Sequence, residues 1–262
     1  MRKHHGFTFV ELVVVVGVIG VLLSLLAPVV AKVRSSARAA ACESNLHQLG
    51  AAWTAYMMDN DSALIPYMWH TPGSKQAYDG YWFGILESFG VKGESLLCPA
   101  ADTPLLIDPA AHREGYGSAG DAWTGRYAPD GTAIRLTKTI YRDGSYGYNR
   151  YLTASGWFGN GSGHASLLAI RDMSNVPVFM DCVFADVRPD PIIPGVAPKM
   201  PTDLTGMQST PATPDLWKLL IARHGKAINV CMADGSVRRV ALSDIYTLTW
   251  KSIWPKTTLS VP

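Results

Sequence analysis

The sequence predicts an α+β fold in which one long N-terminal helix carries an antiparallel β-sheet body with loop-rich insertions. Two stretches of the chain lead to this expectation. Residues 7–31 form an almost continuous apolar run, and residues 32–58 continue it with the three- and four-residue spacing of a helix. Near the other end, residues 227–242 read as two alternating strands around Asp234 and Gly235, a pattern typical of a β-hairpin.

Composition is consistent with a folded body on an anchor. We expect a leader peptide over 1–6, a long helix over 7–60 and a globular body over 61–262. Hydrophobic residues make up 48% of the chain, which is enough for a core, and 24 Gly and 17 Pro indicate many loops. The formal net charge is only +2, so we expect no nucleic-acid partner, because such proteins usually carry a strongly basic surface.

The apolar run over 7–31 is long enough to cross a membrane. A bilayer core needs about 20 residues of helix, whereas the apolar part of a secretory signal has only about 7–15. Glu11 is the only ionisable residue inside the run. A carboxylate in the apolar core costs on the order of 2.5–3.5 kcal/mol, so an acid in this position indicates a function.

The residues around Glu11 carry a family resemblance. Gly6, Phe7 and Glu11, followed by the apolar run, resemble the N-terminal motif of type IV pilins and type II secretion pseudopilins. The resemblance implies a pilin-like fold and cleavage between Gly6 and Phe7 by a membrane aspartyl peptidase, the prepilin peptidase. The same enzyme would methylate the new amine of Phe7. Pro28 matches a proline found in many pilin helices, where it bends the helix.

The resemblance also implies partners and a location. In a filament, Glu11 of one subunit can pair with the amine of Phe7 on its neighbour, since a paired buried charge is tolerated where an unpaired one is not. The partners would be other pilin or pseudopilin subunits, the peptidase and the membrane. Basic Arg2 and Lys3 favour a cytoplasmic N-terminus. We therefore expect a single-pass protein of the bacterial inner membrane, with its body periplasmic or extracellular, or in a filament.

The rest of the chain gives weaker signals. Residues 32–58 predict an amphipathic continuation of the helix, which the polar residues that follow should end. Residues 108–135 show little periodicity and predict an irregular insertion. Residues 176–183 read as a buried strand, and residues 188–216, with seven prolines, as an extended segment.

The hairpin over 227–242 is preceded by His224, and nine residues separate His224 from Asp234. We expect a two-residue turn at Asp234-Gly235. His224, Asp234 and Gly235 resemble the signature of one branch of pilin-like proteins. His224 and Asp234 could be a catalytic or metal-binding pair. The interpretation we favour is that Asp234 suits a turn with positive φ and that His224 braces the hairpin.

The cysteines leave the choice between disulfides and buried thiols open. None of them lies in a Cys-x-x-Cys pair, so a zinc knuckle is not expected. After export, two disulfides with three possible connectivities could form, or some thiols could stay free in the core. The four are Cys42, Cys98, Cys182 and Cys231.

No cofactor or metal site is assigned from the sequence, although calcium is an alternative at two acidic groups. Asp59, Asn60 and Asp61 form one group, and Asp181 and Asp186 the other. Neither group matches an EF-hand loop, so we favour helix-end capping and solvated turns.

The function expected from these residues is that of a non-enzymatic structural subunit of a type IV pilus-like or type II secretion-like assembly. Two alternatives remain. One is a membrane-tethered binding module that uses the pilin-type leader only for sorting, supported by the long aromatic and glycine-rich middle of the chain. The other is a tethered hydrolase that uses His224 and Asp234.

Overall fold

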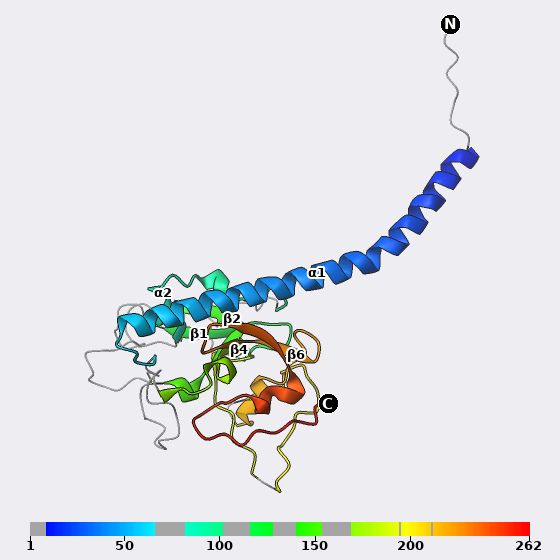
Figure 1. Cartoon of the computed structure of the whole chain (residues 1–262). Helices are drawn as coiled ribbons and strands as arrows, with labels where there is room; N and C mark the ends of the chain where they lie inside the picture. Colours follow the sequence, from blue (N-terminus) through cyan, green and yellow to red (C-terminus); the bar gives the residue numbers. More distant parts are fainter. Residues whose placement is uncertain are drawn as a thin grey trace.

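One long helix projects from an α+β body (Figure 1). The structure is a computed structural model, and it describes residues 9–65, 82–101, 116–127, 140–153, 169–193, 195–210 and 212–262. This architecture confirms the predicted fold class: a long N-terminal apolar helix packed on a mostly antiparallel sheet.

Helix α1 runs over Phe9–Asp59, a length of 51 residues, with Pro28 inside it. Figure 1 shows its C-terminal part lying along the body, while the N-terminal part bends away. The buried residues of α1 all lie from Cys42 onward and recur at helical spacing, so they form the stripe that packs on the body. They are Cys42, Leu46, Leu49, Gly50, Ala52, Trp53 and Met57.

The main sheet has five strands in the order β5-β3-β4-β6-β7. The pairs β3–β4, β4–β6 and β6–β7 are antiparallel, whereas β3 and β5 run parallel. The sheet is therefore mostly antiparallel, with one parallel pair at its β5 edge. The strands are β3 (Tyr146–Asn149), β4 (Pro177–Asp181), β5 (Asp186–Val187), β6 (Ala227–Met232) and β7 (Val237–Ala241).

One strand of a second, two-stranded sheet lies inside the 108–135 region predicted to be irregular, and its partner lies beyond that region. Strand β1 (Trp123–Tyr127) pairs antiparallel with β2 (Ile140–Gly144). The sequence of β1 gives no alternating apolar pattern, and the structure defines the strand by its pairing with β2. The short helices are α2 (Trp82–Glu87) and the 3-10 turns η1 (Gly93–Leu96), η3 (Arg150–Leu152), η6 (Met173–Asn175), η7 (Asp215–Lys218) and η8 (Leu242–Thr247).

The hairpin of β6 and β7 turns through three residues, 233–235, instead of the two expected. The Met232 N–H donates to the Ser236 carbonyl over 2.8 Å, and the Gly235 N–H donates to the Met232 carbonyl over 2.9 Å. Only Gly235 in this loop has a positive φ, of 82°. The expectation of positive φ at Asp234 is therefore wrong, and the loop has the pattern of a turn followed by one left-handed glycine.

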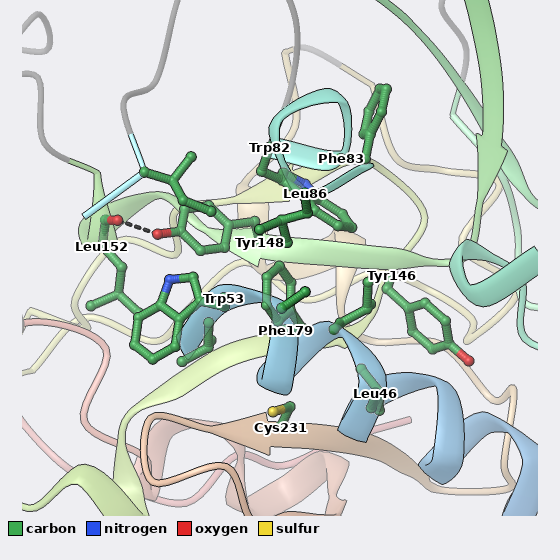
Figure 2. Close-up of a cluster of buried hydrophobic side chains, with 14 of the residues drawn as sticks. Leu46, Trp53, Trp82, Phe83, Leu86, Tyr146, Tyr148, Leu152, Phe179 and Cys231 are labelled. Carbon is green, nitrogen blue, oxygen red and sulfur yellow. Dashed lines mark hydrogen bonds between the residues drawn. The ribbon is translucent and has the colours of Figure 1, made fainter. Parts of the chain in front are cut away.

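Two clusters of buried side chains cover the two faces of the main sheet. Figure 2 shows the first, in which Leu46 and Trp53 of α1 lie over Phe179 and Cys231 of the sheet. The second includes Ile228, Val230 and Met232, the alternate residues of β6, packed against the C-terminal segments of the chain. All six residues of β6 are buried, because the strand is covered on both sides.

Gly50 allows α1 to approach the sheet closely. A side-chain carbon added at Gly50 would lie 2.6 Å from the Cys231 sulfur, which is far inside van der Waals contact. The position therefore requires glycine, and the close approach sets the depth at which α1 packs on β6.

Candidate functional site

The N-terminal part of α1 presents an uncovered apolar surface. Its most apolar stretch of 18 residues has a mean hydropathy of 2.9, and none of that stretch is buried. A buried core helix would be covered by its own body, so this helix needs another apolar environment, either a membrane or neighbouring helices. Large side chains exposed along it include Phe9, Leu12, Val16, Ile19, Leu22, Leu26 and Val33.

Glu11 lies in the first turn of α1, at the outer end of this apolar surface. A carboxylate in the first turn is favoured by the helix dipole, which is positive at the N-terminus. Gly6 and Phe7 fall outside the described residues. Pro28 lies within α1 and has no N–H to donate to the Ser24 carbonyl one turn earlier, which permits a bend there.

The part of α1 that lies on the body is fixed by covalent and polar contacts at one point. Cys42 of α1 forms a disulfide with Cys98, which is 56 residues further along the chain. One turn on, the side-chain amide of Asn45 donates to the Leu97 carbonyl over 2.7 Å. The Tyr146 hydroxyl donates to the Cys42 carbonyl over 3.3 Å. These contacts join the helix to the loop after η1 and to the sheet.

The other two cysteines are buried thiols. Cys182 and Cys231 are both free and fully enclosed. Burial raises the pKa of each thiol to about 12. Since the thiolate is the reactive form, both side chains should be inert at neutral pH. The structure thus divides the four cysteines into one disulfide and two core residues.

His224 lies beside the disulfide, not beside Asp234. Its Nε2 is 3.4 Å from the Cys98 sulfur and 3.4 Å from Oδ2 of Asp181. His224 precedes β6, whereas Asp234 follows it, so the full length of the strand separates them. The structure therefore does not assemble the catalytic or metal-binding pair considered from the sequence.

Arg223 and Asp181 form a buried ion pair behind His224. Nη1 of Arg223 lies 3.5 Å from Oδ1 of Asp181, and both side chains have no exposed surface. The guanidinium also donates to the carbonyls of Ser118 (2.8 Å) and Ala119 (3.2 Å). The backbone N–H of Asn229 donates to Oδ2 of Asp181 over 2.8 Å. A buried charge pair with this many partners fixes how the segment before β6 crosses the sheet.

Asp234 has a local role in the hairpin loop. Its Oδ1 accepts hydrogen bonds from the Ser236 N–H (2.9 Å) and the Ser236 hydroxyl (2.6 Å). Partial burial raises the pKa of the Asp234 carboxyl, but the Ser236 hydrogen bonds outweigh this effect, so the pKa lies below its ordinary value.

Of the two acidic groups considered for calcium, the group of Asp181 and Asp186 faces cations of the chain. Asp181 faces Arg223, and Asp186 lies 3.5 Å from Nη1 of Arg150 and 3.9 Å from Nζ of Lys218. At the end of α1, the Asn60 side chain donates to the Tyr56 carbonyl, as a helix-end residue does. The carboxylates of the second group thus balance cations of the chain itself.

Sequence reasoning missed the Arg223–Asp181 pair and its proximity to the disulfide. The available signal was a charged residue inside an apolar run, as at Asp181 in the 176–183 strand and Arg223 after residues 219–222. Such residues are almost never fully buried without a partner. That signal indicates that a partner exists but does not identify it.

Comparison with known proteins agrees with the geometry of α1. Residues 1–27 match the family described as the prokaryotic N-terminal methylation motif. Over 97 residues the chain is 34% identical to the ComG operon protein 3 homolog of Bacillus licheniformis, an overlap of 37% of this chain and 84% of that protein. No solved structure matches the chain. A methylation motif, an uncovered apolar helix and this relative lead to one conclusion: the chain belongs to the type IV pilin-like proteins, which the N-terminal helix anchors in a membrane.

Proposed function

We propose that this chain is a structural, non-enzymatic subunit of a type IV pilus-like or type II secretion-like assembly. In this proposal the prepilin peptidase cuts between Gly6 and Phe7 and methylates the new N-terminus. The mature helix then leaves the membrane and stacks with copies of itself or with other pilin-like subunits. The observation that carries the proposal is the uncovered apolar surface of α1, which no other part of the described chain covers.

The hydrophobic effect keeps the N-terminal part of α1 out of water, both when it lies in the membrane and when it packs against similar helices. Apolar surface is stabilised by roughly 25 cal/mol for each Å² removed from water, so the N-terminal part of α1 remains either in lipid or against similar helices. Glu11 supplies the register, because its carboxylate tolerates an apolar surrounding only beside a positive charge. The amine of Phe7 on a neighbouring subunit is the charge that we assign to it.

The proposal places the body outside the cytoplasm. Arg2 and Lys3 of the leader favour retention of the N-terminus on the cytoplasmic side. The Cys42–Cys98 disulfide supports this orientation, since disulfides persist in oxidising compartments.

The Glu11→Gln variant tests the pairing. It keeps the size of the side chain and removes its charge, so membrane insertion should be unchanged. Incorporation into sheared filaments should fall about tenfold or more, the loss expected for about 1.4 kcal/mol of subunit contact. The measurement is the ratio of this protein in the filament and membrane fractions of cells in which the native assembly system is active.

Glu43→Gln is the matched control, because it makes the same change on the same helix beyond the apolar surface. It should assemble as the wild type does. Normal incorporation of Glu11→Gln would contradict the pairing, and normal insertion with no wild-type protein in any filament would contradict the subunit function itself.

The size of the body supports a second candidate function. The Bacillus relative overlaps only 37% of this chain, so most of the body lies beyond what the two proteins share. We propose as an alternative a membrane-tethered, extracytoplasmic binding module that uses the pilin-type leader for sorting. Correct processing without co-purification with filaments would favour this function over the first.

A further inference from the structure

Three side chains with strong metal-binding atoms meet where α1 joins the body. The sulfurs of Cys42 and Cys98 and a ring nitrogen of His224 all lie within 4.8 Å of one another. Within the described ranges, this is the one group of three or more His, Cys, Asp or Glu side chains so arranged. Both cysteines are fully buried, and the His224 side chain keeps 7% of its surface exposed.

We propose that the reduced chain binds a zinc-type divalent ion through Cys42, Cys98 and His224, in place of the disulfide. The distance from histidine to sulfur suits this ion, whereas the two sulfurs are bonded to each other in the disulfide and must separate on reduction. Zn–S bonds of about 2.3 Å and Zn–N bonds of about 2.0–2.1 Å place sulfur and nitrogen roughly 3.5 Å apart around a tetrahedral ion. The observed distance from the Cys98 sulfur to Nε2 of His224 is 3.4 Å.

The fourth position of the ion would face Asp181. Oδ2 of Asp181 lies 3.4 Å from the same nitrogen of His224, and it also accepts the Asn229 N–H. A carboxylate at this position can hold a metal-bound water by a hydrogen bond. Three protein ligands and one water is a common coordination for zinc.

Charge balance permits the disulfide and the metal-bound form and disfavours the free dithiolate. The charges of Asp181 and Arg223 offset each other. Two thiolates add two negative charges, and a divalent ion cancels them. Without the ion, the buried cysteines would have to keep their protons, because unpaired charge in the interior is strongly penalised.

The exchange between the two forms needs a reductant and a metal ion. A dithiol gives two electrons and two protons to the Cys42–Cys98 disulfide, which becomes two thiols while the dithiol closes to its own disulfide. The ion then binds both sulfurs and releases the two thiol protons. The helix is thereby held to the body in a reducing compartment by metal and in an oxidising one by the disulfide.

The test uses the full chain in detergent micelles and Co²⁺ alone as the probe. The protein is reduced with a dithiol, which is removed under argon before titration. We expect one Co²⁺ per chain, with the near-ultraviolet thiolate charge-transfer band and the intense visible bands of a tetrahedral site. The oxidised chain should show neither. Cys42→Ser and His224→Ala should each weaken Co²⁺ binding by roughly 100-fold or more, since even second-sphere losses cost 10–100-fold.

Two matched controls separate this site from other ligands of the chain. His47→Ala removes an exposed histidine of the same helix, and the double variant Cys182→Ala/Cys231→Ala removes the remaining thiols. Both should bind Co²⁺ as the wild type does. Binding no tighter in the reduced wild type than in a Cys42→Ser/Cys98→Ser variant would overturn the proposal, as would loss of binding in the Cys182/Cys231 variant alone.

A second measurement on the wild type covers the case in which a variant fails to fold. The reduced chain is treated with an alkylating reagent with and without saturating Zn²⁺, and the masses of its peptides are measured by mass spectrometry. Protection of Cys42 and Cys98 by Zn²⁺ would support the site. Equal alkylation of both residues with and without Zn²⁺ would overturn it.

Discussion

The buried ion pair of Arg223 and Asp181 holds the segment before β6 in place against strand β4. Both side chains are fully enclosed, and the guanidinium spans carbonyls from segments far apart in the sequence. An isolated buried charge would be expensive, so each residue depends on the other. His224 follows Arg223 directly, and its contact with the disulfide is set by this pair.

The Arg223→Met variant should lower the free energy of unfolding by about 3–5 kcal/mol, because it leaves Asp181 as an uncompensated buried charge. The measurement is urea unfolding of the full chain in detergent, followed by tryptophan fluorescence. Arg238→Met, which changes an exposed arginine of β7, serves as the control and should shift stability by less than about 1 kcal/mol. A loss below about 1 kcal/mol in Arg223→Met would contradict the role of the pair.

Asp234 makes a smaller, pH-dependent contribution. Asp234→Ala removes the acceptor of two Ser236 hydrogen bonds and should cost about 1 kcal/mol at neutral pH. The folded pKa of Asp234 is depressed, so its stabilisation is present above the unfolded value of about 3.9 and is lost as the pH falls through the folded value.

Wild type and Asp234→Ala should therefore differ in stability at pH 7 and converge as the solution becomes strongly acidic. Comparing their unfolding midpoints along a pH series checks this sign. A difference that grows on acidification would contradict the assigned hydrogen bonds. The variant Asp244→Ala changes an acid outside the hairpin loop and is the matched control.

The sequence predicts the role of a single residue well where neighbouring residues determine it, and poorly where the residue interacts with one that is distant in the sequence. Glycine at 235 follows from the need for a left-handed residue in a tight hairpin loop, although the loop is one residue longer than expected. The contacts of Asp181 with Arg223 and His224 span more than 40 residues of chain. No local pattern encodes such a pairing, since it depends on strand order.

The element that controls the architecture is the junction of α1 with the body. The Cys42–Cys98 disulfide closes a loop across a separation of 56 residues, between the helix and the segment after η1. Cross-linking a loop of this size removes roughly 4 kcal/mol of chain entropy from the unfolded state. The disulfide therefore keeps α1 covalently attached to the body.

The Cys42→Ser/Cys98→Ser variant should lose up to about 4 kcal/mol of stability toward urea when measured with a metal chelator present. In the wild type, Cys182 and Cys231 should resist alkylation until the body unfolds, because burial raises the pKa of both thiols to about 12. A loss of less than about 1 kcal/mol in the double serine variant would contradict the stabilising role of the disulfide.

Elements with a strong hydrophobic periodicity could be predicted from the sequence, whereas elements whose conformation depends on tertiary contacts could not. The 51-residue α1 follows from an apolar run that passes into an amphipathic stripe, and β6 from alternation beside a turn. Strand β1 and the parallel pairing of β5 with β3 were missed. Strand β5 has only two residues, and β1 has no alternating apolar pattern, so their pairing partners decide their conformation.

At the scale of the whole molecule, the structure separates an uncovered apolar helix segment from the folded body. The N-terminal part of α1 leaves the body with its apolar side chains uncovered, while the part from Cys42 onward packs on the sheet. Figure 1 shows this division in the bent helix and the body on its C-terminal part. The motif at Gly6, Phe7 and Glu11 could be predicted from the sequence, whereas the pairing of the cysteines could not, because three connectivities satisfied the same sequence.

Intact-mass and N-terminal peptide mass spectrometry of the protein from its native membrane tests the central claim most directly. The account predicts a mature chain that begins at Phe7 and carries one added methyl group. A chain that still begins at Met1, in cells whose prepilin peptidase is active on other substrates, would contradict the proposed processing and assembly and leave a plain signal-anchored protein.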